Sequence, residues 1–495
     1  MRRDRSAVSA GLDQFWSNGK VEWQAHRLKL LKRQMHGRSG SLLLRRRVLP
    51  FYPTVEARHL THYEVPTKVR KNLFQTGADT FSCRTPQEDR EGVADWPICY
   101  NLRVESKRPL RGIALLLDCR PLSWTSREDM HIAVCRALLE RGVQPVMVFS
   151  EISGVLRRTY EDAGVIVEEV NYRRGAAQYF RRMRTIFRQY HVDMVDIEFF
   201  AYFDPIAWIA RFNGVKNIVF TESNSGVMRA RSWKAALLRL RAALVTAPVR
   251  RFVAISDFVR QQMLLLGLED ARISVVHKGI DLRRYLPDAE ARDRLMDRYG
   301  GRPDEIILGT VTIMRRFKHP EVILEACALL QKRNVPFRLF VAGGGELGPE
   351  MEALAVRLGI ANRVHWLGYV DRPEYFMRGW DVFLLASEGE AFGFVMAEAM
   401  CCGVPVVASA SGAIPEIVEH GRTGFVTPLL DADAMAEAIR SLAQDESLRR
   451  EMAAACVARV RDQFSVDGAV EKTLRVYESM WSAEEPARRR SPARG

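Results

Sequence analysis

The sequence lacks several features that would assign it to a functional class at once. It has no run of about eighteen apolar residues, so we expect no membrane-spanning helix. The N-terminal stretch MRRDRSAVSAGLDQFW is basic but has no apolar core, so we do not expect a secretory signal there. Zinc-finger, RNP-type and basic-zipper patterns are also absent, and we therefore expect no nucleic-acid partner.

Cysteine is scarce, with 8 residues in a chain of 495, and no two of them have CxxC spacing. That pattern is typical of buried thiols in a reducing compartment and disfavours disulfides or a structural zinc site. The sequence also has no cluster of His and Asp residues that would indicate a site for another metal ion. We therefore expect a cytoplasmic protein that needs no metal or other cofactor.

The charge is unbalanced, with 74 Lys and Arg against 60 Asp and Glu and a formal net charge of +14. A phosphorylated substrate or an anionic membrane face would explain this excess. Hydrophobic residues make up 47% of the chain, which is enough for sizeable cores. The length favours two to four domains.

The two ends of the chain differ from the middle in composition and in the pattern of apolar residues. Residues 1–108 form an irregular basic extension, and residues 482–495 form a basic tail that we predict to be disordered. Within the extension, Val21–Met35 has apolar side chains at helical spacing and a basic opposite face. Such a helix either packs on the body of the protein, which we favour, or lies on an anionic membrane surface.

From about residue 109 onward, short apolar runs alternate with amphipathic helical segments. This alternation predicts a parallel, doubly wound sheet, and it restarts after a polar Pro/Gly-containing segment near residue 285. We therefore expect two Rossmann-like α/β domains, 109–284 and 285–465, with their carboxyl edges facing a cleft. The apolar runs cover 112–118, 144–150, 165–170, 192–200, 215–223, 251–256 and 273–281, then 305–313, 337–344, 363–370, 381–387 and 404–409.

The stretch SEGEAFGFVMAEAM, Ser387–Met400, contains the clearest candidate site. Glu390 follows the apolar run 381–387, Gly393 allows a tight turn, and a helix then begins whose free N–H groups attract phosphate. Glu398 lies inside that apolar helix, where a carboxylate costs several kcal/mol unless it accepts hydrogen bonds. The vicinal hydroxyls of a ribose would supply them. One ligand with a sugar, phosphates and a ribose would therefore satisfy the whole stretch.

Seven residues separate Glu390 from Glu398, and AMCCGVPVVASASGAIPEIV and GRTGFVTP follow. This resembles the E-x7-E motif of the retaining glycosyltransferases of the GT-B fold, family 4, also called glycosyl transferases group 1. The resemblance covers roughly residues 110–480. It extends to VAISDFVRQQM, HKGIDLRRYLP, GTVTIMRRFKHPEVILEA, VAGGGE and FSVDGAVEKTLRVYESM.

The resemblance implies a nucleotide diphosphate sugar as donor and an acceptor that it does not identify. It implies that Glu398 binds the ribose, that Glu390 contacts the transferred sugar, and that Lys318 neutralises the leaving diphosphate. Glu390 and Lys318 are thus the expected catalytic residues of a metal-independent enzyme of polysaccharide biosynthesis. Residues 466–481 would form a final helix that crosses back to the first domain. The backbone amides expected at the distal phosphate or sugar are those of Phe392, Gly393 and Phe394.

Three positions depart from the family pattern. Ile313 stands where an arginine is common, so Arg315 or Arg316 would supply the second positive charge. The loop Asp118–Ser126 contains no glycine, whereas the family usually has a Gly-Gly loop there, and Glu222 lies where a histidine is common. The alternatives to a glycosyltransferase are a non-catalytic glycan-binding or scaffold protein of this fold and a sugar-nucleotide epimerase.

Two further motifs have structural explanations. Gly343, Gly345 and Gly348 spell GxGxxG after an apolar run, which we interpret as a tight turn facing the donor and not as a dinucleotide site. Asp431 and Asp433 resemble a metal-binding DxD pair, but they open a helical segment, where N-capping explains them.

Overall fold

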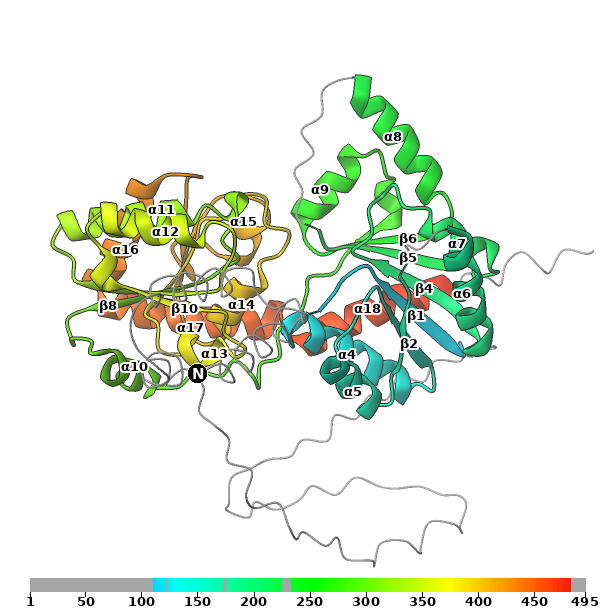
Figure 1. Cartoon of the computed structure of the whole chain (residues 1–495), viewed down its shortest axis with the longest axis horizontal. Helices are drawn as coiled ribbons and strands as arrows, with labels where there is room; N and C mark the ends of the chain where they lie inside the picture. Colours follow the sequence, from blue (N-terminus) through cyan, green and yellow to red (C-terminus); the bar gives the residue numbers. More distant parts are fainter. Residues whose placement is uncertain (1–109, 122, 172–175, 225–232, 482–495) are drawn as a thin grey trace, which may run out of the picture. The chain divides into compact units, whose positions relative to one another are not determined.

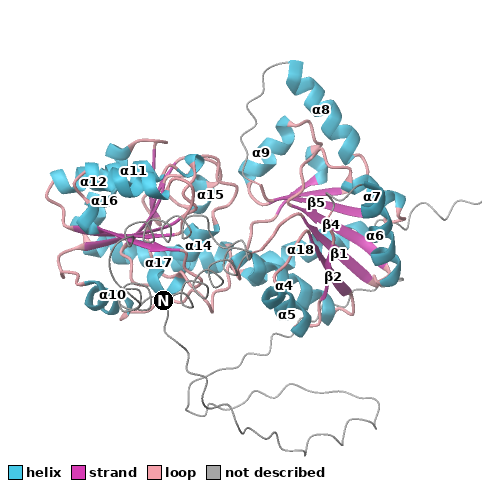
Figure 2. Cartoon of the chain, viewed as in Figure 1, coloured by secondary structure: helices cyan, strands magenta, loops and turns pink. Residues whose placement is uncertain are grey.

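The computed structural model describes residues 110–121, 123–171, 176–224 and 233–481 (Figure 1). The extension 1–108, with its expected helix at 21–35, and the tail 482–495 lie outside the described residues. The described chain forms two parallel β-sheets flanked by helices (Figure 2), which confirms the predicted doubly wound α/β class. Among these residues, no helix combines the length and apolarity that a membrane crossing requires.

The first sheet has the strand order β3-β2-β1-β4-β5-β6-β7, and its strand pairs are parallel. On β1, Ile113 and Leu115 belong to one apolar cluster and Ala114 and Leu116 to another, because successive side chains point to opposite faces. Helices cover both faces, which is why this strand reads as a continuous apolar run. The strands are β1 (Gly112–Leu117), β2 (Gln144–Phe149), β3 (Ile166–Glu169), β4 (Val192–Glu198), β5 (Asn217–Glu222), β6 (Arg251–Ala254) and β7 (Ile273–Val275).

We call each sheet with the helices that pack on it a unit, the first unit for the sheet β1–β7 and the second for the sheet β8–β13. Side-chain caps begin several helices of the first unit. Thr125 and Glu128 form a reciprocal capping box at α4, and Ser153 and Ser256 cap α5 and α9. The helices are α4 (Ser126–Glu140), α5 (Gly154–Asp162), α6 (Ala176–Gln189), α7 (Ile206–Phe212), α8 (Trp233–Thr246), α9 (Asp257–Leu265) and the 3-10 turn η3 (Asp270–Arg272).

The second sheet has the order β10-β9-β8-β11-β12-β13, again with parallel pairs. Its strands are β8 (Ile306–Val311), β9 (Phe337–Ala342), β10 (Val364–Gly368), β11 (Val382–Leu385), β12 (Val406–Ser409) and β13 (Gly424–Thr427). The sequence pattern did not predict β13. The helices are α10 (Ala291–Tyr299), η4 (Arg316–Lys318), α11 (Pro320–Lys332), α12 (Gly348–Arg357), η5 (Ala361–Arg363), α13 (Glu374–Met377), α14 (Phe394–Cys401), α15 (Ile414–Ile417), α16 (Ala432–Gln444) and α17 (Glu446–Gln463).

The chain passes between the two sheets twice, and the two passages are hydrogen-bonded to each other. The Ile280 N–H donates to the Phe464 carbonyl at 2.8 Å, and the Val466 N–H donates to the Ile280 carbonyl at 3.0 Å. The last helix, α18 (Val466–Trp481), then packs on α4, and Tyr477 Oη donates to Asp196 Oδ2 of β4 at 2.6 Å. Residues from both ends of the described chain therefore build the core of the first unit.

Gly279 allows the close approach of these two passages. A Cβ at this position would lie 2.4 Å from the Val466 Cα, which is backbone and has little freedom to move. We expect Gly279→Ala to lower the free energy of unfolding by about 2 kcal/mol or more, because the two segments must separate. Gly154→Ala is the matched control, since a Cβ there meets nothing within 4 Å. Equal denaturation midpoints for the two variants would contradict this account.

Candidate active site

Lys318 and Glu390 lie together at the carboxyl edge of the second sheet. Lys318 ends the short turn after β8, and Glu390 lies in the loop after β11, the strand that pairs with β8. The Lys318 Nζ donates to the Glu390 Oε2 at 2.6 Å, and their side chains are only 17% and 12% exposed. The Glu388 N–H also donates to the Phe317 carbonyl at 2.7 Å. Two contacts therefore join the loops that contain the expected catalytic residues.

The turn before α14 presents backbone to this edge. Gly393 has a φ of +82°, a left-handed conformation that glycine adopts without strain, and the helix begins at Phe394. The Phe392 side chain is buried and packs against the rings of Phe394, Phe464 and His277. Phe392 can therefore offer a ligand only its backbone.

Glu398 is buried and already has a hydrogen-bond partner. The Ser126 hydroxyl, on the first residue of α4, donates to Glu398 Oε1 at 2.6 Å. Ser126 Oγ also lies 3.2 Å from the Tyr285 hydroxyl oxygen. Burial raises the pKa of Glu398, and the Ser126 bond opposes the rise. The sequence pattern indicated neither Ser126 nor Tyr285, because both are distant from Glu398 along the chain.

Gly343 supports the segment that leads to Lys318. Its φ is +117°, its N–H donates to the Gly368 carbonyl at 2.6 Å, and a Cβ would lie 1.9 Å from the Thr312 carbonyl oxygen. The loop after β9 is thus in direct backbone contact with the loop after β8. This close packing accounts for a glycine at position 343.

The other basic residues of this edge lie in solvent. Arg315 and Arg316 are exposed, and neither forms an ion pair with any residue that the structure describes. Ile313 is 56% exposed. The sequence reasoning missed His319, which has a φ of +43° and lies between two acids, 2.9 Å from Glu321 and 3.6 Å from Glu388.

A buried charge cluster lies at the corresponding edge of the first sheet. Glu198, the last residue of β4, accepts from Lys278 Nζ at 2.6 Å and lies 3.0 Å from His131 Nε2. Burial alone would raise the pKa of Glu198, but Lys278 and His131 together hold it well below its ordinary value of 4.5. Glu222, which the sequence singled out, lies at the end of β5, where burial raises its pKa.

Glu416 forms a second contact between the two units. Its carboxylate accepts from the backbone N–H groups of Asp257 and Phe258, at 2.7 and 2.6 Å, in the first turn of α9. Candidate metal-ligand atoms of Asp257, His277 and Glu416 lie within 4.8 Å of one another. Since two N–H groups already occupy the Glu416 carboxylate, a helix cap explains this cluster.

The DxD resemblance also has a structural explanation. Asp431 Oδ1 accepts from the Ala434 N–H at 2.9 Å, so it caps α16 as predicted. Asp433 forms an ion pair with Arg333 at 2.6 Å.

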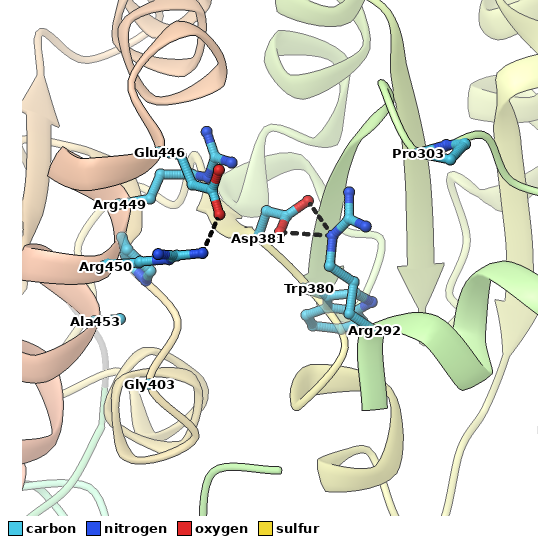
Figure 3. Close-up of a pocket in the computed structure, with 10 residues that line it drawn as sticks. Arg292, Pro303, Trp380, Asp381, Gly403, Glu446, Arg449, Arg450 and Ala453 are labelled. Carbon is cyan, nitrogen blue, oxygen red and sulfur yellow. Dashed lines mark hydrogen bonds and ion pairs between the residues drawn. The ribbon is translucent and has the colours of Figure 1, made fainter. Parts of the chain in front are cut away.

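A cavity of about 340 Å³ lies at the opposite edge of the second sheet (Figure 3). Asp381 and Pro405 line it and directly precede β11 and β12, whereas Lys318 and Glu390 follow β8 and β11. Arg292 is paired with Asp381 at 3.1 Å, and Arg450 with Glu446 at 2.5 Å. Arg449, which also lines the cavity, donates to the backbone carbonyls of Leu442 and Ala443. The cavity is separate from the candidate site.

Two family models match the chain in tandem. The model described as Glycosyltransferase Family 4 matches residues 132–284, and the model described as Glycosyl transferases group 1 matches residues 291–457. The chain belongs to the family 4 glycosyltransferases. Within the second match lie the paired Lys318 and Glu390, and also Glu398, whose carboxylate accepts from Ser126.

The curated relatives of this family 4 chain include two kinds of enzyme. It is 31% identical over 245 residues to D-inositol 3-phosphate glycosyltransferase of Kribbella flavida, covering 47% of this chain and 57% of the relative. It is 33% identical over 207 residues to N-acetyl-alpha-D-glucosaminyl L-malate synthase of Bacillus anthracis, covering 41% and 53%. The chain thus spans little more than half the length of these relatives.

Solved structures with the same fold include a glycosyltransferase from Rickettsia africae. It has a TM-score of 0.65 and 19% identity, and the match covers 76% of this chain and all of the other. Anabaena HepE in complex with UDP-glucose has a TM-score of 0.63 and 20% identity, covering 75% of this chain and 99% of the other. These similarities establish the GT-B fold.

The Glu198 cluster predicts a strong and specific stability effect. Lys278→Met would leave Glu198 buried without its cation, so we expect the free energy of unfolding to fall by about 3–5 kcal/mol in chemical denaturation. The double variant Lys278→Met/Glu198→Leu should recover most of the loss. Arg283→Met, which removes an exposed pair with Asp281, should cost less than about 1 kcal/mol.

The same cluster fixes the sign of one pH effect. The pKa of Glu198 is lowered in the folded protein, so its stabilising contribution is complete above about pH 4.5 and is lost as the pH falls toward the folded pKa. The double variant should therefore lose less stability than the wild type on acidification below pH 4.5. Parallel acid-denaturation curves would contradict this assignment.

Proposed function

We propose that this protein is a retaining, metal-independent glycosyltransferase that moves a sugar from a nucleotide diphosphate sugar to an acceptor hydroxyl. The observation that supports this most is the Lys318–Glu390 pair at 2.6 Å, at the sheet edge where α14 begins. Such an edge is where open α/β sheets bind their ligands. The named activities of the relatives and the UDP-glucose bound to HepE agree with a nucleotide-sugar donor.

Each residue has a role that follows from its chemistry. Lys318 stabilises the negative charge that develops on the diphosphate as the bond to the sugar breaks. Glu390 accepts hydrogen bonds from hydroxyls of the transferred sugar, and Glu398 accepts from the ribose hydroxyls. Exposed Arg315 and Arg316 add positive charge near the phosphates, a role that a metal ion has in other transferases. The backbone N–H groups of the Phe392–Phe394 turn face the distal phosphate.

Transfer with retention needs no protein nucleophile in this scheme. The bond from the anomeric carbon to the phosphate oxygen breaks, and the acceptor oxygen bonds to the same face of that carbon. The acceptor proton passes to the departing phosphate oxygen, which has become the strongest base nearby. Lys318 stays protonated throughout and holds the leaving group in place.

The setting of this reaction is also a proposal. The described cysteines are free thiols, which agrees with a reducing compartment, and we place the enzyme in the cytoplasm. We assign it to the synthesis of a polysaccharide or glycoconjugate, and peripheral contact with an anionic membrane would bring it to a lipid-linked acceptor. The alternatives are a non-catalytic glycan-binding protein, favoured by Ile313 and by the glycine-free loop after β1, and a sugar-nucleotide epimerase.

Donor binding and transfer can be tested separately with three substitutions. UDP-, GDP- and ADP-sugars are screened by thermal shift, and the correct donor at a hundredfold excess over its Kd should stabilise the protein by about 2.7 kcal/mol. Glu398→Ala should abolish most of this shift. Lys318→Ala should retain binding but slow release of the sugar from the donor about 100-fold or more, because its contact strengthens only as charge develops. Glu390→Gln should lose part of the thermal shift and part of the rate of sugar release.

Lys332→Ala and Glu437→Ala are the controls, since they change the same residue types on helices α11 and α16. An unchanged thermal shift in Glu398→Ala would refute the donor site. Wild-type binding without any sugar release or transfer would support the glycan-binding alternative. A donor whose sugar is inverted at one carbon and stays attached would support an epimerase.

The Ser126 contact predicts how the donor enters. The Ser126 hydroxyl donates to Glu398 Oε1, and we propose that a ribose hydroxyl of the donor takes its place. We expect Ser126→Ala to bind UDP or the preferred nucleotide about tenfold more tightly, because a hydrogen bond to a charged group contributes about 1.5 kcal/mol to the ligand-free state. The unliganded variant should be less stable by a similar amount.

Ser150→Ala is the matched control, since Ser150 donates to Asp118 Oδ1 at the same distance of 2.6 Å but does not contact Glu398. Titration calorimetry measures both variants. Weaker nucleotide binding in Ser126→Ala would show instead that the serine contacts the ligand.

A further inference from the structure

His319 directly follows Lys318 and has an unusual backbone conformation. Its φ of +43° and ψ of +51° lie in the left-handed region, which glycine adopts freely and other residues seldom adopt. The residue before a proline also prefers extended backbone, and Pro320 follows His319. His319 nevertheless ends the turn η4 and begins α11, so Lys318 is the last residue before the chain changes direction. Contacts around His319 must therefore hold this conformation.

The His319 side chain lies between two carboxylates. Its Nδ1 lies 2.9 Å from Glu321 Oε1, and because a carboxylate only accepts, this nitrogen donates. Its Nε2 is buried and forms no hydrogen bond in the part of the chain that the structure describes, although Glu388 Oε2 lies 3.6 Å away. That distance exceeds the range of a hydrogen bond by roughly half an ångström.

A small approach of the Glu388 loop would complete this second hydrogen bond. The imidazolium form of the His319 ring can donate to both acids at once. A buried nitrogen without a partner costs free energy, so the approach of Glu388 to Nε2 is favourable. Hydrogen bonds in an active site are often long in the ligand-free protein and shorten when the substrate binds.

Glu388 connects His319 to the second loop of the candidate site. It lies two residues before Glu390 in the loop after β11, and its N–H donates to the Phe317 carbonyl at 2.7 Å. The Lys318 Nζ donates to Glu390 Oε2 at 2.6 Å. Three consecutive residues, Phe317, Lys318 and His319, thus contact the Glu390 loop. When a donor diphosphate draws Lys318 away from Glu390, the contacts of Phe317 and His319 would still hold the two loops together.

We propose that His319 is a positioning residue, which ties the Lys318 turn to the Glu390 loop through Glu388 and so sets the rate of sugar transfer. This role rests on the proposed function. His319 would act through Lys318 and Glu390 and not on the substrates themselves. It keeps the Lys318 ammonium and the Glu390 carboxylate at the spacing that the breaking bond requires, since a small misplacement of such groups lowers the rate strongly. The left-handed backbone is then maintained for the sake of the side chain.

Three substitutions at His319 separate the role of its side chain from that of its backbone. His319→Gly relieves the backbone and removes the ring, so kcat for release of the sugar from the donor should fall about tenfold or more while the donor Kd stays unchanged. His319→Asn places an amide nitrogen at the site of Nδ1 but nothing at Nε2, and asparagine tolerates the left-handed region, so it should be slowed to a similar extent. His319→Gln places its amide nitrogen near the site of Nε2 and should keep most of the wild-type rate.

His191→Gly is the matched control, because His191 is exposed and has a φ of +50° directly before β4 in the first sheet. It makes the same change of residue and should leave kcat and the donor Kd as in the wild type. Thermal melting verifies that each variant is folded. A wild-type kcat in His319→Gly would overturn the proposal, and so would an equal loss of rate in His319→Gln and His319→Gly.

A second measurement distinguishes failure of this proposal from failure of the proposed function. If the wild type releases no sugar from any donor, the proposed function fails, but equilibrium unfolding of His319→Gly, Glu388→Gln and the double variant still tests whether His319 ties the loops together. The product of the two single effects on the unfolding equilibrium constant should exceed the effect of the double variant by about threefold. Independent effects of the two substitutions would show that His319 and Glu388 do not interact and would overturn the proposal.

Discussion

Lys318 and Glu390 form an ion pair between two loops, and this pair depends on the parallel arrangement of the strands before them. Parallel strands all end at the same edge of a sheet, and β8 and β11 are neighbours in the second sheet, although Lys318 and Glu390 are 72 residues apart in the chain. The left-handed Gly393 and the close backbone contact of Gly343 with Thr312 hold those loops in place. The backbone geometry of these loops therefore positions the charges of the site, and the side chains of Lys318 and Glu390 then form the ion pair.

A buried carboxylate needs hydrogen-bond donors, and this requirement links the two units. Glu398 of the second unit accepts from Ser126 of the first, and Glu416 accepts from the N–H groups that begin α9. Both acids lie on the second unit, and all three donor groups lie on the first. In the proposed reaction, a donor ribose replaces the Ser126 hydroxyl on Glu398, so donor binding and the contact between the units compete for one oxygen.

Charge has different roles in different parts of the molecule. In the first sheet, the buried carboxylate of Glu198 is paired with Lys278 and contacts His131. At the candidate site, Lys318 is paired, whereas Arg315 and Arg316 stay in solvent and are available to a phosphate. Most of the net charge of +14, however, comes from the two ends of the chain: residues 1–108 have 21 Lys and Arg against 11 Asp and Glu, and residues 482–495 have 4 against 2.

The sequence alone determined the α/β class, nearly all the strands and the stretch that contains Glu390 and Glu398, because apolar periodicity and the E-x7-E spacing are local. It also predicted that Lys318 and Glu390 would serve one site, and the tertiary structure then supplied their contact. Only the tertiary structure decided that Ser126 and Tyr285 meet Glu398, that His319 lies between two acids, and that Glu198 is the charged centre of the first sheet. The sequence also did not show that the leucine side of α8 is exposed, since leucines at helical spacing predict burial unless the fold places that face in solvent. These contacts join residues far apart in the chain. A local sequence pattern cannot predict them, because the packing of the sheet and its helices decides which distant segments come together.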